Sequence, residues 1–118
     1  MLFKYWKGGN CLMEINDLVK EAHQNAVEHG FWEDYSAAFQ KDIVNNAIGN
    51  RLMLIVSEVA EAQDGLRHND MDNFREELAD VAIRLADLCG GLNVDIEKEI
   101  KKKMETNRSR PYKHGKAF

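Results

Sequence analysis

The chain is poor in the features that mark secreted and membrane proteins. Only one of its 118 residues is proline, and only two, Cys11 and Cys89, are cysteine. Cysteines this far apart form neither a disulfide framework nor a metal-binding spacing, so we expect reduced thiols, with Cys89 in a core, and a cytoplasmic protein. No apolar run approaches the roughly 18 residues of a membrane span, and no secretory signal is evident.

A surplus of positive charge is also missing. Lys and Arg number 16 against 20 Asp and Glu, which gives a net charge of −4. A protein that binds nucleic-acid polymers in general needs a broad basic surface to neutralise phosphates. The negative net charge argues against a binder of this kind. Basic residues gather only toward the C-terminal end of the chain.

Apolar residues recur at helical rather than strand spacing, which predicts an all-α protein. We expect helices over about 16–29, 42–66, 72–91 and 95–108, with Asn16 and Asp72 as N-caps and Asp95 as the first residue of the last helix. Residues 1–13 have no clear period and contain a Gly-Gly break, so we interpret them as an N-terminal extension. Residues 14–118 then form a single domain, a size that is often stabilised by oligomerisation.

Two short acidic patterns, Glu58-x-x-Glu61 and Glu77-x-x-Asp80, lie in otherwise apolar helical sequence with fifteen residues between them. Positions i and i+3 share one helix face, so each pattern turns two carboxylates the same way. A single such pair is usually a solvated face. Two pairs beside apolar seams, joined by a connection short enough for a helical hairpin, instead predict a cluster that a hard divalent cation would neutralise. All-oxygen ligands favour Mg²⁺, with Mn²⁺ as the second choice.

The apolar seams are expected to form the core. On the first helix of the hairpin the apolar arc is centred on Leu52 and Val59. On the second, a 4-3-4-3 spacing defines the seam, which consists of Phe74, Leu78, Val81, Leu85 and Leu88. Asp87 follows Asp80 along the flank, and we expect it to pair with Arg84 at i−3.

Two further groups carry recognition chemistry. Lys103, Asn107 and Arg110 recur at i, i+4 and i+7, which places two cations and an amide on one stripe. Such a stripe is a solvated face by default, but these side chains also bind polyphosphate and sugar. The aromatic, acidic stretch 31–35 is either a hydrophobic cap over the end of the helices or a wall on which a base stacks.

These residues resemble a known family, the MazG-like all-α nucleoside triphosphate pyrophosphohydrolases. The two acidic patterns are similar to its ExxE…ExxD signature, and residues 103–111, Lys-Met-Glu-Thr-Asn-Arg-Ser-Arg-Pro, are similar to the Lys-Met-x-x-Asn-x-x-Arg segment that follows it. His23 and Trp32 resemble the His and Trp with which the dCTP-cleaving members contact their base. The stretch from Trp32 to Glu58 is longer here, and His68 stands where those enzymes carry a second aromatic, so the base preference is left open.

The resemblance implies a four-helix bundle-type protomer that hydrolyses a (deoxy)nucleoside triphosphate between its α- and β-phosphates, with house-cleaning of the nucleotide pool as the expected role. Magnesium would be held by Glu58, Glu61, Glu77 and Asp80, and Glu58 or Glu61 would instead orient or deprotonate the attacking water. Substrate would be contacted by His23, Trp32, Lys103, Asn107 and Arg110.

Two other classes of protein compete with this interpretation. A non-enzymatic helical interaction module would carry the same acids as a solvated face and would bind no divalent cation tightly. A di-iron carboxylate bundle would need Glu-x-x-His pairs, and both patterns here end in a carboxylate, so it ranks last.

An oligomer is expected from the helix that carries the first acidic pattern. Between residues 50 and 62 this helix is apolar over more of its circumference than the neighbours in so small a protomer can cover, and Met53, Leu54 and Ala60 fall outside its main arc. The resemblance implies the same, because members of the family pair their bundles. We therefore predict a homodimer or homotetramer.

Overall fold

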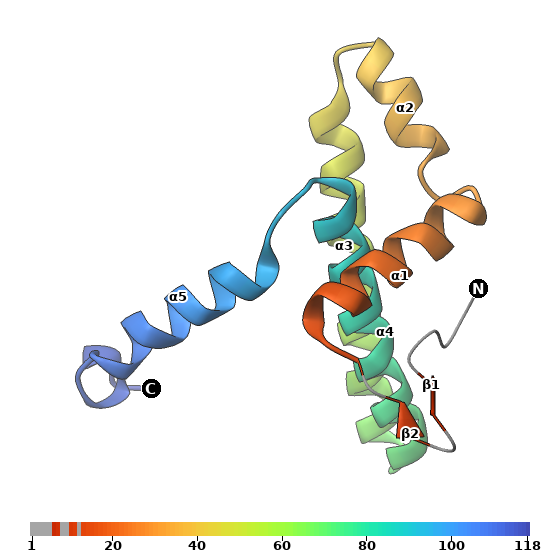
Figure 1. Cartoon of the computed structure of the whole chain (residues 1–118). Helices are drawn as coiled ribbons and strands as arrows, with labels where there is room; N and C mark the ends of the chain where they lie inside the picture. Colours follow the sequence, from red (N-terminus) through yellow and green to blue (C-terminus); the bar gives the residue numbers. More distant parts are fainter. Residues whose placement is uncertain (1–5, 8–9, 12) are drawn as a thin grey trace.

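The structure is a computed structural model that describes residues 6–7, 10–11 and 13–118. Five α-helices follow one another along the chain: α1 (Ile15–Glu28), α2 (Glu33–Gln40), α3 (Val44–Arg67), α4 (Met71–Gly91) and α5 (Ile96–Arg108). A 3₁₀ turn at Tyr112–Gly115 comes last, and a short antiparallel pair, β1 (Trp6–Lys7) and β2 (Asn10–Cys11), comes first. The predicted all-α class is confirmed for the body of the chain (Figure 1).

The centre of the molecule is the antiparallel hairpin of α3 and α4 (Figure 1). α1 packs along α4, and α2 folds back against the first part of α3. α5 touches α1 near its start, where Asn16 Nδ2 donates a hydrogen bond to Glu97 Oε2 at 3.4 Å, and then extends away from the hairpin. The predicted four-helix bundle is therefore not confirmed within one chain.

The helix starts differ from the predictions by one or two residues. α1 begins after Glu14, whose backbone N–H donates to Asp17 Oδ2 at 3.2 Å, rather than after Asn16. α4 is capped by Asp70, which accepts from the Asn73 N–H at 3.0 Å, so the prediction of Asp72 as N-cap is wrong. Asp95, predicted as the first residue of the last helix, is instead its N-cap one residue earlier, since it accepts from the Lys98 N–H at 3.1 Å.

The sequence predicts no helix between residues 29 and 42, but α2 lies there and begins within the stretch 31–35. Glu33 and Asp34 stand in its first turn, where negative side chains interact favourably with the helix dipole. The dense aromatic residues obscured this start in the sequence. Asp42 has a positive φ of 57° and marks the turn into α3, which begins two residues later than expected.

The core of the protomer is small. Among the described residues no large side chain is fully buried, and the buried apolar residues are Trp32, Ala38, Ala47, Ala62, Ala86, Leu88 and Cys89. Burial raises the pKa of the Cys89 thiol, as expected of an unreactive core cysteine. Leu78 and Leu85 on α4 are close to half exposed, and so are Leu52 and Val59 on α3. The prediction that both apolar seams form the core is therefore wrong for the single chain.

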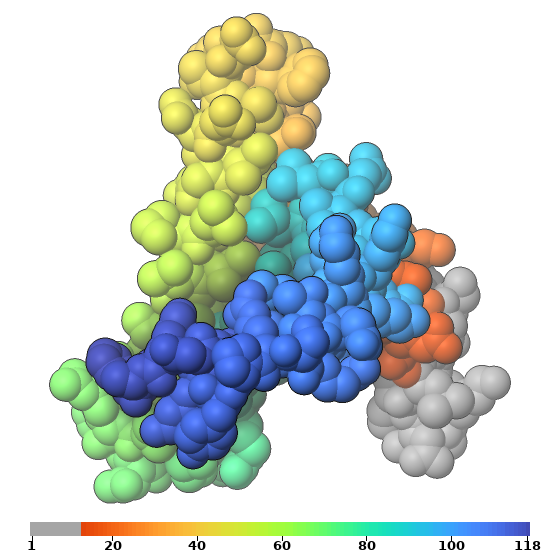
Figure 2. All heavy atoms as spheres, turned by 90° about the vertical axis from the view of Figure 1, so that its left-hand side faces the viewer, coloured from red at the N-terminus to blue at the C-terminus, as the bar shows by residue number. Residues whose placement is uncertain are grey.

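The protomer is also open in shape. Its radius of gyration is 17.0 Å, whereas a compact domain of this length has roughly 13.5 Å. α5 contributes visibly to this openness, because it extends away from the hairpin in Figure 1 and stands in front of the other helices in the turned view of Figure 2. No helix in the described part of the chain is both long and apolar enough to cross a membrane.

Two glycines allow α1 and the turn after it to approach the end of α4. A Cβ atom on Gly90 would lie 2.6 Å from the Cβ of His23, and one on Gly91 would clash with the indole ring of Trp32. The sequence suggested these glycines only as a helix end. In the structure they also set how closely His23 and Trp32 pack against α4.

Candidate functional site

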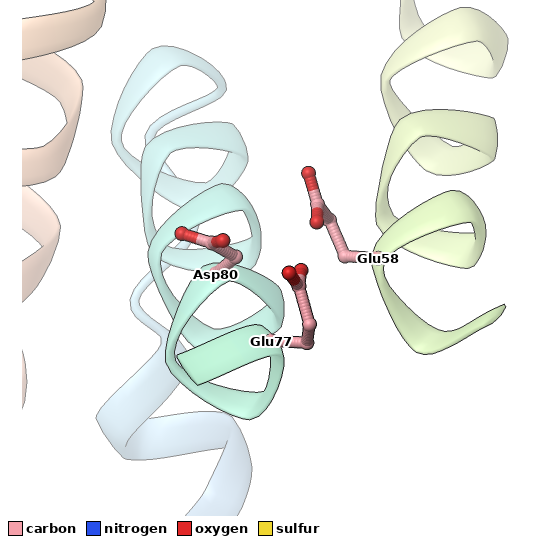
Figure 3. A group of neighbouring side chains, drawn as sticks. All are labelled: Glu58, Glu77 and Asp80. Atoms are coloured by element: carbon pink, nitrogen blue, oxygen red, sulfur yellow. The ribbon is translucent and has the colours of Figure 1, made fainter. Parts of the chain in front are cut away.

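The α3–α4 hairpin brings the two acidic patterns together. Glu58 projects from α3 toward Glu77 and Asp80 on α4, and one carboxylate oxygen from each residue lies within 4.8 Å of the others (Figure 3). Glu58 is buried, while Glu77 and Asp80 are half-buried. We call these three residues the carboxylate triad. Three of the four predicted metal ligands therefore meet at one place.

Glu61, the fourth predicted ligand, lies outside the triad. It is exposed, one turn along α3 from Glu58. Its carboxylate is nevertheless close enough to Glu77 to raise the pKa of that residue. Glu61 thus borders the triad on the solvent side.

Within the triad, the pKa values of Glu58 and Glu77 are shifted in opposite directions. The pKa of Glu77 is raised to about 7, first by its hydrogen bond with Glu58, then by desolvation and by Glu61. The pKa of Glu58 is lowered, first because Arg84 Nε donates to Glu58 Oε1 at 2.7 Å. Within the described part of the chain, the buried Oε2 atom of Glu77 has no hydrogen-bond partner. The carboxylates of the triad thus keep a proton up to about pH 7, and one buried oxygen has no hydrogen-bond partner. A hard divalent cation bound here would replace the proton and provide that oxygen with a partner.

The raised pKa of Glu77 predicts how the stability of the metal-free protein depends on pH. The folded protein keeps this proton up to about pH 7, whereas an unfolded glutamate loses it near its ordinary value of 4.5. The folded state therefore binds more protons between these values, and the contribution of Glu77 to stability falls as pH rises from about 4.5 to about 7.

We expect Glu77→Gln, which resembles the protonated form, to lose less thermal stability than the wild type between about pH 5 and pH 8 in EDTA. Thermal melts across this range measure the effect. Glu76→Gln, at an exposed neighbouring position on α4, is the matched control and should keep the wild-type slope. Equal slopes in wild type and Glu77→Gln would contradict the assignment of the proton.

Asp87 does not pair with Arg84, so that prediction is wrong. Arg84 reaches across to Glu58 on α3, while Asp87 Oδ1 accepts from Trp32 Nε1 at 2.8 Å and lies 3.0 Å from His23 Nδ1. Helical spacing made an i−3 pair possible, but each side chain has a better-placed partner on a neighbouring helix. Asp87 thereby joins His23 and Trp32, the two residues predicted to contact a base.

Trp32 is an interior residue of the protomer, with only 8% of its surface exposed. The rings of His23 and Tyr35 meet it edge-on with centroids 4.9 and 5.0 Å away, and the Arg51 guanidinium covers its ring at 4.0 Å. This burial is what a cap over the helices predicts. A base could stack on the Trp32 ring only after Arg51 moved.

Arg51 is a functional candidate that the sequence reasoning missed. It is buried, and it donates to both carboxylate oxygens of Asp34 at 2.8 and 3.1 Å, to Phe31 O at 2.9 Å and to Ala47 O at 3.0 Å. These hydrogen bonds hold the pKa of Asp34 below its usual value. The available signal was a lone cation seven residues before Glu58, which places both on one face of α3.

A cavity of about 600 Å³ lies between α1, α3 and α4. Glu58, Asp80 and Arg84 line one part of it, and Asp34 and Arg51 line another. Seven residues of helix separate Arg51 from Glu58 along α3, or about 10 Å. The volume falls within the range of small-molecule sites. His23 instead lines a second hollow of about 540 Å³ beside Cys89, and neither wall includes Trp32.

The basic stripe does not reach this cavity within one chain. Lys103, Asn107 and Arg110 are exposed, the first two on α5 and the third just after it. No residue of α5 lines the cavity. In Figure 1 α5 points away from α3 and α4. These three residues could act at the carboxylates only if α5 moved or came from another copy of the chain.

Fold and site together define an all-α protein whose central hairpin carries a carboxylate triad able to hold a metal ion. Comparison of the chain with protein-family models, with curated proteins and with solved structures finds no match. The family resemblance therefore depends on the residue patterns alone.

Proposed function

We propose that the protein is a Mg²⁺-dependent, MazG-like nucleoside triphosphate pyrophosphohydrolase of the cytoplasm, which converts a (deoxy)nucleoside triphosphate to its monophosphate and pyrophosphate. The observation that carries this proposal is the convergence of Glu58, Glu77 and Asp80 from two helices, with Glu58 and Asp80 lining a cavity of nucleotide size. These three residues and Glu61 would hold Mg²⁺, or Mn²⁺ in its place. A bound ion of this kind supplies charge neutralisation and Lewis acidity at the phosphates.

The proposed reaction also needs a residue that activates the attacking water and residues that contact the base or sugar. Water attacks the α-phosphorus, the bond from that phosphorus to the bridging oxygen breaks, and pyrophosphate leaves. Glu61 is better suited than Glu58 to orient this water and accept its proton, because Glu61 is exposed at the edge of the triad, whereas Glu58 is buried within it. Arg51 and Asp34, about two turns of helix from the triad, would face the base or sugar.

A homodimer or homotetramer is part of this proposal. The outer face of α3, defined here as Leu52, Val56, Val59 and Leu66, is about half exposed along its length. α5 likewise exposes Ile100 and Met104 and has little of its own chain to pack on. A second copy that covered the outer face of α3 would bury apolar surface on both sides. Its α5 would then be a source of Lys103, Asn107 and Arg110 for the cavity.

The competing function is a non-enzymatic helical interaction module. The exposed outer face of α3 favours it, because such a face binds a partner helix as readily as a second copy. A screen for pyrophosphate release across standard and modified (deoxy)nucleoside triphosphates with Mg²⁺ separates the two. Release from at least one triphosphate, abolished by EDTA, is the expected result. No release from any of them would favour the interaction module.

Trp32→Ala should raise KM and reduce discrimination between bases. Removing the indole leaves Arg51 and Asp87 without their shared neighbour at the cavity, and it should also destabilise the fold by about 3–5 kcal/mol. Trp32→Phe, which keeps a ring under Arg51 but loses the hydrogen bond to Asp87, should have a smaller effect on both. If only the melting temperature fell and the substrate profile stayed unchanged, Trp32 would be a cap and nothing more.

A further inference from the structure

Arg84 forms an ion pair with the carboxylate triad through Glu58. Within the described residues it is the only cation that is ion-paired with any of Glu58, Glu61, Glu77 and Asp80. Its Nε donates to Glu58 Oε1 at 2.7 Å, and its side chain is 38% exposed where that of Glu58 is 11% exposed. Arg84 therefore lies at the boundary between the triad and the cavity that it helps to line.

Arg84 still has hydrogen-bonding capacity. A guanidinium carries five N–H donors, and the hydrogen bond to Glu58 uses the one on Nε. The four donors on its terminal nitrogens have no partner among the described residues. These terminal groups form the planar fork that binds phosphate oxygens in pairs.

Arg51, the other cation that lines the cavity, is already committed. Its two terminal nitrogens donate to Asp34, Phe31 O and Ala47 O, and its guanidinium lies on the Trp32 ring. The cations of α5 do not line the cavity within the chain. Arg84 is thus the cation of this cavity with donors available for an anionic ligand.

We propose that Arg84 exchanges partners during the reaction cycle. Without a divalent cation it neutralises Glu58, and with the cation and substrate bound it leaves Glu58 and binds an oxygen of the polyphosphate. The inference rests on the proposed function and adds a phosphate-binding residue to it. A divalent cation held by Glu58 repels the guanidinium and takes over its role as counter-charge, so the two compete for the same carboxylate.

Removing Arg84 should change the affinities for two ligands in opposite directions, because Arg84 competes with a divalent cation for Glu58 but helps to bind the polyphosphate. Arg84→Gln should bind Mn²⁺ more tightly in the absence of nucleotide, since Glu58 no longer has a competing partner. The same variant should bind inorganic pyrophosphate about tenfold or more weakly in the presence of Mg²⁺, since hydrogen bonds to a charged group are lost. The KM for a triphosphate should rise in parallel.

Mn²⁺ binding is measured by electron paramagnetic resonance and pyrophosphate binding by calorimetry, both on the full chain. Arg84→Lys keeps the charge but loses the fork, so it should bind Mn²⁺ as the wild type does and pyrophosphate more weakly. Arg75→Gln removes an exposed cation from the same helix, where Arg75 pairs with Asp72, and should change neither affinity. Should Arg84→Gln fail to fold, Arg84→Lys carries the test.

Weaker Mn²⁺ binding in Arg84→Gln, or unchanged pyrophosphate binding in both variants, would overturn the inference and leave Arg84 as a positioning residue for Glu58. The proposed function fails separately. Opposite shifts in the two affinities, without hydrolysis of any triphosphate by the wild type, would support the partner exchange and reject the enzyme. If the wild type bound neither Mn²⁺ nor pyrophosphate, both proposals would be wrong.

Discussion

Asp80→Asn should abolish Mg²⁺-dependent pyrophosphate release, and Glu61→Gln should do the same, while the helices stay intact. Each substitution replaces a charged oxygen ligand or base with a neutral amide of nearly the same shape. The expected loss of kcat/KM is at least about a hundredfold, because hard cations depend strongly on carboxylate charge. Asp80 should act through the triad, where its oxygen lies within 4.8 Å of Glu58 and Glu77.

The same substitutions should leave the metal-free protein as stable as the wild type or more stable. Removing one of several clustered negative charges lowers their mutual repulsion, so melting temperatures in EDTA should be unchanged or higher. Glu76→Gln, which neutralises an exposed carboxylate next to Glu77, is the control and should keep full activity. Activity within about tenfold of wild type in both Asp80→Asn and Glu61→Gln would refute the metal site.

Val59→Lys should dissociate the oligomer and remove most of the activity. The single chain exposes 9203 Å² of solvent-accessible surface, whereas a compact monomer of 13.5 kDa exposes roughly 6,500 Å². Val59 lies on the outer face of α3 with 52% of its surface exposed, and a lysine there would place an ammonium group in the proposed interface. Activity should fall with the mass if a second copy supplies the basic residues of α5.

Light scattering at micromolar concentration measures this effect directly. The wild type should have a mass of at least twice 13.5 kDa, and Val59→Lys should approach the mass of one chain. Val27→Lys makes the same exchange at an exposed valine on α1, outside the outer face of α3, and should leave the mass unchanged. A wild-type mass near 13.5 kDa with full activity would contradict the oligomer.

Features that depend on residues close together in the sequence could be predicted. The spacing within each acidic pattern and the short turn between α3 and α4 were enough to predict that Glu58, Glu77 and Asp80 meet, because a short connection makes consecutive helices antiparallel neighbours. Helix type was predictable for the same reason. The exact caps were less so, since Asp70 and Asp72 are equally suitable in sequence.

Contacts between helices could not be predicted in this way, because they depend on how each helix is rotated about its axis. The pairing of Arg84 with Glu58 instead of Asp87 is such a contact, and so is the burial of Trp32 under Arg51. The seam residues Leu78 and Leu85 also have the correct helical period but stay close to half exposed, since periodicity identifies an apolar face without identifying what covers it.

The hydrogen bonds of Arg51 have a consequence for the order of α2. An eight-residue helix is too short to be stable alone in water, because the free energy needed to nucleate a helix exceeds the stabilisation that one or two turns provide. The Arg51 guanidinium donates to the carbonyl of Phe31, two residues before the helix, to Asp34 in its first turn, and to the carbonyl of Ala47 on α3. Part of the stability of α2 therefore comes from a side chain of a different helix, and the same side chain fixes the position of Asp34 in the wall of the cavity.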